Sequence, residues 1–263
     1  MIIVTAVRDF QLYDRLVRKN PSNGKAKFYP IDNTVLNRGI PTRYNEFLEN
    51  YDYGGDEWIV FCHEDWEAME DLEQILSTLD KGSLHGPIGI NSKKIIGRIY
   101  QCHRDGSCLQ PIGHACKAGT IVGTFDCQCL IVHSSLVQRH HLRFDEHLKF
   151  DLYVEEFCIN CSETYGIASR IVPVKCCHHS LGKVEQRFFE CLDYVNKKHA
   201  HAKKIYVSIV EGVVCCGPML KFLLKKMLEK IMNYLYQNSV TSHNKRLIKI
   251  CKIPIWDKKI KTN

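Results

Sequence analysis

The stretch Trp58-Ile59-Val60-Phe61-Cys62-His63-Glu64-Asp65 decides the fold of this chain. Its five apolar residues in succession predict a buried strand of the kind found in parallel sheets. The run then ends in three polar residues, two of which are acidic. Ligands of open α/β sheets gather at the carboxyl ends of the strands, so the sequence places His63, Glu64 and Asp65 where a binding site would form.

Two earlier segments predict further strands of the same sheet. They are Ile2-Ile3-Val4-Thr5-Ala6-Val7 and Lys27-Phe28-Tyr29-Pro30-Ile31, and helical patterns follow them over residues 10–18 and 42–50. Strands that alternate with helices are typical of βαβ units on a mostly parallel sheet. The sequence therefore predicts an α/β fold.

The pattern changes after residue 80. Short β-like pieces separated by glycines follow, and the glycine-rich residues 106–119 predict a loop over the site. Residues 66–79 and 152–165 predict helices, and residues 170–174 predict a strand that leads into Cys176-Cys177-His178-His179. We find no internal repeat and no low-complexity segment.

The net charge of +7 is unevenly distributed along the 263 residues. From Pro218 to Asn263, 11 Lys and Arg residues stand against 2 acidic residues, which leaves 25 against 27 in the rest of the chain. A nucleic-acid-binding globule carries its basic stripe on the folded part. Because the body of this chain is slightly acidic, we expect no nucleic-acid partner.

Fourteen cysteines would indicate a disulfide scaffold in a short secreted chain. This chain is long, begins Met-Ile-Ile-Val, and has no positively charged leader region. Its most apolar stretch, residues 219–236, is interrupted by four lysines and a glutamate and is thus unlike a membrane span. We therefore expect reduced thiols, a cytoplasmic location and no membrane crossing.

The C-terminal residues 218–263 predict a separate basic, helical tail behind a folded domain of residues 1–217. Apolar residues between 220 and 235 recur at helical spacing and form one stripe flanked by lysines. Such a basic amphipathic helix either docks on the body or lies on an anionic inner membrane face, where each basic residue adds about 1 kcal/mol. The second alternative predicts a peripheral membrane protein.

Asp65 is the candidate metal ligand at the end of the third strand. One carboxylate together with diphosphate oxygens suits Mg²⁺ or Mn²⁺, and residues 63 and 65 of an extended segment point the same way. Asp is also a common N-cap, so the same letters fit the start of an exposed acidic helix.

Three carboxylates near the start of the predicted helix 152–165 are candidates for a general base. Asp151, Glu155 and Glu156 begin or line this helix, and Asp151 and Glu155 share a face at i, i+4 spacing. A carboxylate that faces the cleft and stays ionised could accept a proton from an acceptor hydroxyl. Acids that stabilise a helix N-terminus give the same pattern.

The run Cys176-Cys177-His178-His179, with Cys158 and Cys161 upstream, offers a second interpretation as a zinc site. Structural zinc motifs separate the two members of each ligand pair by two to five residues, whereas this run is contiguous. Because neighbours on a strand face opposite sides, at most two of its four residues could converge. Buried thiols that act as small hydrophobes are the other explanation.

Taken in order, several segments resemble glycosyltransferase family 2, in particular the branch grouped with streptomycin-biosynthesis-type proteins. The resemblance covers roughly residues 2–190 and is carried by eight segments. They are Ile3 to Arg8, Ile31-Asp32-Asn33, Arg43-Tyr44-Asn45, Ile59 to Asp65, Phe125-Asp126, Phe144-Asp145-Glu146, Tyr153 to Cys158, and His178-His179-Ser180-Leu181-Gly182.

The resemblance implies a glycosyltransferase A-type fold, with a Rossmann-like nucleotide-binding half and a mixed central sheet. It also implies a metal-dependent, inverting transfer of a sugar from a nucleotide-sugar to a glycan or lipid-linked acceptor, as in surface polysaccharide biosynthesis. By analogy Asp65 and His179 hold Mn²⁺ or Mg²⁺, with His178 as the alternative, and Glu155, Glu156 or Asp151 is the base. The nucleotide-sugar would be bound by Thr5, Val7, Arg8, Asp32, Asn33, Asn45, His63, Glu64 and Asp126.

Two positions depart from the family pattern. Val154 stands where the family commonly has an acid, and Cys127 stands where it usually has a glycine. These departures keep two alternatives open beside the active transferase. One is a fold of this type that only binds nucleotide, and the other is a zinc-stabilised binding module.

Overall fold

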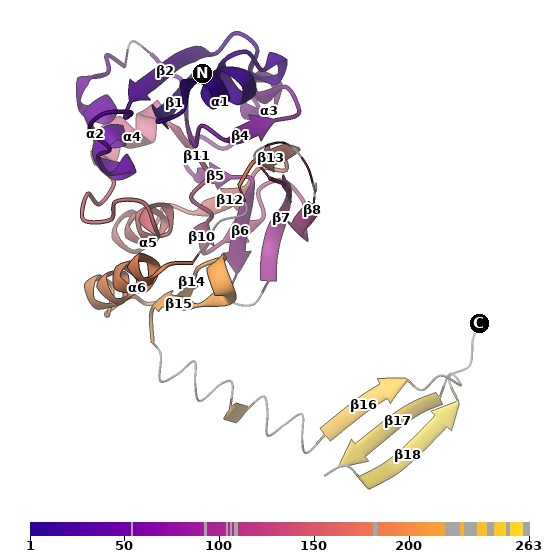
Figure 1. Ribbon diagram of the computed structural model, residues 1–263. Helices are drawn as coiled ribbons and strands as arrows, with labels where there is room; N and C mark the ends of the chain where they lie inside the picture. The colour runs from indigo at the N-terminus through magenta and orange to yellow at the C-terminus, as the bar shows by residue number, and fades with distance from the viewer. Residues whose placement is uncertain are drawn as a thin grey trace. The chain divides into compact units, whose positions relative to one another are not determined.

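The computed structural model of the protein describes residues 1–53, 55–91, 94–103, 105, 107, 110–180, 184–218, 227–228, 236–240, 245–250 and 253–259. The chain divides into two units, Met1–Gly217 and Pro218–Asn263, which we describe separately. The first unit contains two mixed β-sheets with helices packed against them (Figure 1).

A seven-stranded mixed sheet forms the centre of the first unit, in the order β2-β1-β3-β11-β5-β12-β9. Its first three strands are parallel, and β11 is antiparallel to both of its neighbours. The strands are β1 (Ile2–Val7), β2 (Lys27–Asp32), β3 (Trp58–Cys62), β5 (Leu84–Gly86), β9 (Ile121–Val122), β11 (Cys129–His133) and β12 (Ser169–Ile171).

A second sheet of six strands carries the rest of the site. Its order is β10-β6-β7-β13-β4, with β8 paired to β7. The strands are β4 (Trp66–Ala68), β6 (Ile88–Asn91), β7 (Lys94–Gln101), β8 (Gln110–His114), β10 (Thr124–Phe125) and β13 (Cys176–His178). A short pair, β14 (Tyr206–Val207) and β15 (Val214–Cys216), completes the unit.

Six α-helices accompany the sheets in the described part of the first unit. They are α1 (Phe10–Tyr13), α2 (Ile40–Asn50), α3 (Leu72–Leu76), α4 (Ser134–His140), α5 (Tyr153–Tyr165) and α6 (Gln186–Lys198). Helix α1 continues as a π-helical segment over Asp14–Arg18, and single 3₁₀ turns cover Pro21–Asn23 and Val210–Gly212.

Both faces of the central sheet are buried, which explains the uninterrupted apolar run of β3. Phe61 belongs to a core cluster with residues of α2, α4 and α5, whereas Val60 belongs to a second cluster with residues of α1 and α3. Successive side chains of a strand point to opposite faces, so one strand contributes to both clusters. Figure 1 shows α2 and α4 on one side of β1 and α1 and α3 on the other.

The predicted α/β class is confirmed, with its Rossmann-like first half and mixed central sheet. The three predicted strands and the helix over 152–165 are present as β1, β2, β3 and α5.

Two local predictions are wrong. Residues 66–79 were expected to form one helix, but Trp66–Ala68 is a strand that pairs with Cys176–His178, and only Leu72–Leu76 is helical. The expected loop 106–119 contains strand β8, which pairs antiparallel with β7.

The second unit contains a three-stranded antiparallel sheet of β16 (Tyr236–Val240), β17 (Lys245–Ile250) and β18 (Ile253–Lys259). The tail was expected to be helical, so this expectation is corrected for these residues. The predicted amphipathic helix over 220–235 lies outside the described residues, except for Met227 and Leu228, which are helical. Among the described helices, none has the length and apolar character needed to cross a membrane.

Candidate active site

Two adjoining cavities lie at the carboxyl ends of the parallel strands, as expected for an α/β sheet. The first has a volume of about 380 Å³ and the second about 540 Å³, which is within the range of ligand pockets. His63 and Asp65 line both of them, together with Phe150 and Ser180. The end of β3 therefore forms the junction between the cavities.

Three potential metal ligands meet at this junction. The ligand atoms of His63, Asp65 and His178 all lie within 4.8 Å of one another. His178 Nε2 is 3.3 Å from Asp65 Oδ1, and β13 brings His178 to the site from the second sheet. Imidazole and carboxylate groups suit Mn²⁺ and related divalent cations, so this donor set fits the metal predicted from the sequence.

Protonation at the junction is set by burial and by Asp65. Burial lowers the pKa of the His63 imidazole, and the nearby His178 adds to this effect while Asp65 opposes it. For His178, burial also disfavours the charged form, but the hydrogen bond and negative charge of Asp65 outweigh it and raise the pKa. Neutral imidazole is the form that binds metals, so His63 is well suited to be a ligand.

Tyr153 fixes the tautomer of His63. The Tyr153 hydroxyl donates to the Cys127 carbonyl at 2.8 Å and lies 3.0 Å from His63 Nε2. Because the hydroxyl donates its single proton to the Cys127 carbonyl, it accepts a hydrogen bond from the Nε2–H of His63. This arrangement leaves Nδ1 with a lone pair for a cation, as in other sites where a neighbouring group orients a ligating histidine.

The first cavity has a cationic lining. Arg8, Arg38, Lys149 and Arg187 line it, against two acidic residues, Glu64 and Asp65. Glu64 Oε2 accepts hydrogen bonds from the backbone N–H groups of Arg8 and Asp9, at 2.6 and 2.9 Å. The Glu64 carboxylate is thus hydrogen-bonded to the backbone at the end of β1. With more cationic than acidic residues in its lining, the cavity suits an anionic ligand.

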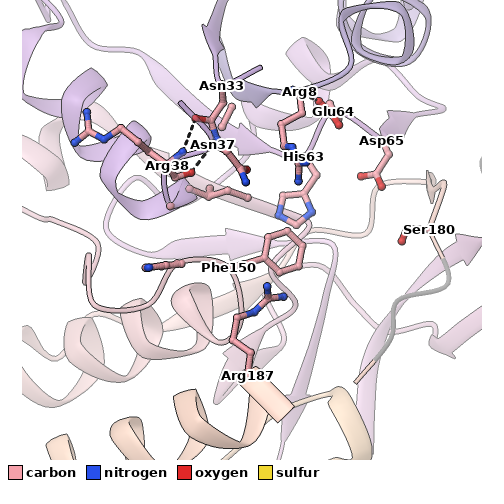
Figure 2. A pocket seen from close by; sticks show the side chains of 14 residues that line it. Arg8, Asn33, Asn37, Arg38, His63, Glu64, Asp65, Phe150, Ser180 and Arg187 are labelled. Atoms are coloured by element: carbon pink, nitrogen blue, oxygen red, sulfur yellow. Dashed lines mark hydrogen bonds between the residues drawn. The ribbon is translucent and has the colours of Figure 1, made fainter. Parts of the chain in front are cut away.

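An aromatic ring links the cationic wall to the junction. Figure 2 shows Phe150 between the His63 imidazole and the Arg187 guanidinium. The His63 and Phe150 rings are stacked with their centroids 5.7 Å apart, and the guanidinium lies 5.3 Å from the Phe150 centroid. Arg187 also donates to Asp151 Oδ2 at 2.6 Å.

Glu155 is the buried carboxylate of the second cavity. It lines that cavity from the first turn of α5 and is 1% exposed. Ser208 Oγ donates to one of its oxygens at 2.8 Å, and the Cys127 thiol donates to the other at 3.1 Å. Burial raises its pKa to about 7, the Asp126 charge adds to this effect, and the two hydrogen bonds oppose it. A carboxyl group with such a pKa is suited to proton transfer near neutral pH.

The other two carboxylates proposed as a base have different surroundings. Glu156 lies within 2.6 Å of Lys198 Nζ and 2.9 Å of His199 Nε2, and it lines neither cavity. Asp151 lines the second cavity but is paired with Arg187. The structure therefore separates Glu155, which faces the cavity, from a structural Glu156.

Several predicted nucleotide-binding residues do not line the cavities. Thr5 and Val7 are fully buried in β1. Asn45 exchanges hydrogen bonds with the backbone of Phe144, which joins α2 to the loop between α4 and α5. Asp32 accepts from Thr34 in a turn beside the first cavity, and these hydrogen bonds lower its pKa.

Besides His63, four predicted nucleotide-binding residues reach the cavities. Arg8, Asn33 and Glu64 line the first, and Asp126 lines the second, where it accepts from Gln128. Asn33 exchanges two hydrogen bonds with the backbone of Arg38, which shapes the loop along the cavity wall (Figure 2).

The structure assigns the two adjacent histidines differently from the prediction. His179, named as the metal ligand, lines neither cavity, and its Nε2 lies 2.7 Å from Glu67 Oε2. The His178 imidazole faces the Asp65 carboxylate, whereas the His179 side chain is directed to Glu67. His179 contacts Asp65 through its backbone N–H, which donates to the Asp65 carbonyl at 2.8 Å. The donor group at the junction thus contains His178, the alternative given by the family resemblance, and not His179.

Sequence reasoning did not identify Lys149, Arg187, Tyr153 and Ser208 as site residues. Lys149 and Arg187 reach the cavity from segments outside the parallel strands, so no strand-end pattern marks them. Tyr153 was part of the family resemblance but carried no role, and Ser208 lies in an irregular segment after β14.

No protein-family model and no curated protein sequence matches this chain. Solved structures that it resembles include GalNAc-T7, crystallised with UDP, GalNAc and Mn²⁺ (9% identity, TM-score 0.46), and TarS from S. aureus (12% identity, TM-score 0.43). Each comparison covers 95% of this chain, but 65% and 58% of the other chain. Both TM-scores lie below 0.5, so we base the functional inference on the residues of the site.

Proposed function

We propose that the protein is a metal-dependent glycosyltransferase that transfers a sugar from a nucleotide-sugar donor to a hydroxyl acceptor. The observation that carries this proposal is the position of His63 and Asp65 at the junction of two cavities with different chemistry. One cavity is lined by cations, and the other contains a buried carboxyl group with a pKa of about 7.

The first cavity would hold the nucleotide diphosphate. The guanidinium groups of Arg8 and Arg187 extend towards His63 and would offset part of the negative charge of a diphosphate (Figure 2). Arginine forms bidentate hydrogen bonds with phosphate oxygens. Asn33 and its loop lie beside the end of β2, where the base or ribose would be bound. The sugar would then extend past His63 and Asp65 towards the second cavity.

His63, Asp65 and His178 would hold the divalent cation. When bound, such a cation acts as a Lewis acid that neutralises the charge developing on the leaving diphosphate. The chain's own contribution is the fixed donor set, in which Tyr153 orients His63 and Asp65 pairs with His178.

Glu155 would accept the proton of the acceptor hydroxyl. As the acceptor oxygen forms a bond to the anomeric carbon, the bond between that carbon and the diphosphate oxygen breaks, and the electron pair leaves with the diphosphate. A single in-line displacement of this kind inverts the anomeric configuration. Each Glu155 oxygen accepts one hydrogen bond in the structure and has a further lone pair for this proton.

Val154 and Cys127 are compatible with an active enzyme. Val154 is buried in the core, and the adjacent Glu155 supplies a carboxyl group to the cavity. The Cys127 thiol is a hydrogen-bond donor to that carboxyl group. The departures from the family pattern therefore leave the site with a potential base.

A thermal-shift screen of nucleotide-sugars, with and without Mn²⁺, tests the proposal. A ligand at 100 times its Kd stabilises the folded state by about 2.7 kcal/mol, so a bound donor raises the melting temperature and does so more strongly with the metal. Hydrolysis of that donor then separates an active enzyme from a protein that only binds nucleotide. If no nucleotide-sugar shifts the melting temperature under either condition, the proposal fails.

The basic C-terminal residues would place a cytoplasmic enzyme near a lipid-linked or membrane-displayed acceptor, as in surface polysaccharide assembly. The support is the excess of Lys and Arg over acidic residues from Pro218 to Asn263. Flotation with anionic liposomes should recover the full chain but not a chain that ends at Gly217. Equal recovery of the two chains would contradict this placement.

A further inference from the structure

A second group of potential metal ligands lies behind the candidate active site. Cys102 and Cys177 have their sulfur atoms 3.1 Å apart, and His179 Nδ1 lies 3.4 Å from the Cys102 sulfur. The three ligand atoms all lie within 4.8 Å of one another. The side chains belong to buried residues that are 1%, 2% and 7% exposed. The proposed glycosyl transfer uses none of them.

Two strands build this group. Cys177 and His178 of β13 pair in parallel with β7, and Cys102 directly follows β7. The Cys102 N–H donates to the backbone carbonyl of His178 at 3.1 Å, which holds the two segments together. Because side chains alternate along a strand, Cys177 and His179 face one side while His178 faces the active-site junction.

A carboxylate fixes the tautomer of the histidine. His179 Nε2 lies 2.7 Å from Glu67 Oε2, and Glu67 belongs to β4, which pairs antiparallel with β13. A carboxylate accepts a hydrogen bond from Nε2–H, so Nδ1 keeps its lone pair and is directed towards the sulfurs. Histidine ligands of zinc commonly donate their second N–H to a carboxylate in this way.

We propose that Cys102, Cys177 and His179 bind a zinc ion. Two thiolates and one imidazole are a donor set for zinc rather than for Mg²⁺ or Mn²⁺, which prefer oxygen ligands. Zinc bonds of about 2.3 Å to sulfur in a tetrahedral site separate two sulfurs by about 3.8 Å, so the thiols move apart by several tenths of an ångström. Glu67, whose side chain is 34% exposed, marks the solvent side of the group.

This site differs from the zinc site considered from the sequence. Cys158 and Cys161 are fully buried on α5 and belong to the core cluster of the central sheet. Cys102, which lies 75 residues before Cys177, takes their place in the proposed site.

The proposed zinc would hold β13 against the end of β7 and thereby support the position of His178. The zinc site itself does not depend on the proposed glycosyl transfer.

Zinc analysis of the full-length protein tests the proposal. After expression with added zinc and dialysis, we expect one zinc per chain by elemental analysis. X-ray absorption at the zinc edge should find two sulfur ligands and an imidazole nitrogen. A shell of nitrogen and oxygen alone would place the zinc at His63, Asp65 and His178, and would overturn the proposal.

Matched variants assign the ligands. Cys102→Ser and Cys177→Ser should lose the zinc and, after reconstitution with Co²⁺, the thiolate-to-metal charge-transfer band. Cys158→Ser and Cys161→Ser remove equally buried thiols and should keep both signals. If Cys102→Ser and Cys177→Ser do not fold, X-ray absorption at the zinc edge of the unmodified protein still shows whether sulfur binds the metal. A zinc-free protein, or a Cys102–Cys177 disulfide in protein isolated without reductant, would overturn the proposal.

Discussion

His178 Nε2 lies 3.3 Å from Asp65 Oδ1 and joins the second sheet to the carboxyl end of β3. The adjacent His179 faces the other way, towards Cys102 and Glu67. Two neighbouring histidines thus belong to two different clusters of potential metal ligands. This separation gives the account a sharp test, because the two residues are chemically identical.

His178→Gln should weaken Mn²⁺ binding, whereas His179→Gln should remove the zinc. Loss of a partner that orients a metal ligand costs about 10- to 100-fold in affinity, so loss of a ligand itself should cost at least tenfold. Titration calorimetry with Mn²⁺ and elemental analysis of the same samples measure both effects. The reverse result, with Mn²⁺ binding lost only in His179→Gln, would restore the assignment made from the sequence.

Glu155 should govern the pH dependence of the reaction. Its pKa of about 7 means that it is mostly protonated at pH 6 and ionised at pH 8. Nucleotide-sugar hydrolysis should therefore rise with pH through about 7, and Glu155→Gln should lower kcat by about 10²- to 10⁴-fold, as is typical for loss of a general base.

Glu156→Gln is the matched control for this prediction. It removes the charge that faces Lys198 and His199, and breaking a buried ion pair costs about 3–5 kcal/mol of stability. We expect a lower melting temperature with an unchanged pH profile. A flat profile in the unmodified protein would exclude Glu155 as the base.

The raised pKa of Glu155 also predicts how stability depends on pH. The folded protein holds the Glu155 proton up to a pH of about 7, whereas the unfolded chain releases it near the ordinary glutamate pKa of 4.5. Between these values the native state binds more protons, so this group makes stability fall as pH rises, by about 1.4 kcal/mol for each unit of pKa shift. Glu155→Gln should remove this loss, as measured by urea unfolding at pH 5 and pH 8. An identical pH dependence in the variant would contradict the assignment.

Arg187 should contribute to diphosphate binding. Arg187→Ala removes a guanidinium that lies over Phe150 and lines the first cavity. A hydrogen bond to a charged group contributes about 1.5–3 kcal/mol, which corresponds to at least a tenfold loss of affinity for a nucleoside diphosphate. The nucleoside alone should bind equally to both proteins. Arg139→Ala, on the exposed face of α4, is the control.

The secondary structure was predictable from the sequence wherever the local residue pattern favours the same state that tertiary packing imposes. The apolar run of β3 is buried on both faces, and it was found from the sequence, as was the 13-residue helix α5. Trp66–Ala68 was misassigned because its strand state depends on pairing with Cys176–His178, more than 100 residues away. A local pattern contains no information about such a partner.

The site was predictable at the strand ends and less so elsewhere. His63 and Asp65 follow a strand directly, so their position was clear from the sequence. The choice between His178 and His179 depends on which face of β13 meets the junction, and a shift of one residue would exchange them. Likewise, the rotation of α5 about its axis decides which of the two glutamates faces the second cavity and which faces Lys198.

The most direct test of the central claim is calorimetry of nucleotide binding with and without Mn²⁺ in the unmodified protein and in Asp65→Asn. Asp193→Asn, which alters an exposed pair with Lys197 on α6, is the control. We predict that Mn²⁺ strengthens binding of a nucleoside diphosphate in the unmodified protein and in Asp193→Asn, but not in Asp65→Asn. Equal Mn²⁺-dependent binding in all three proteins would contradict the assignment of the metal and the donor to the junction of the two cavities.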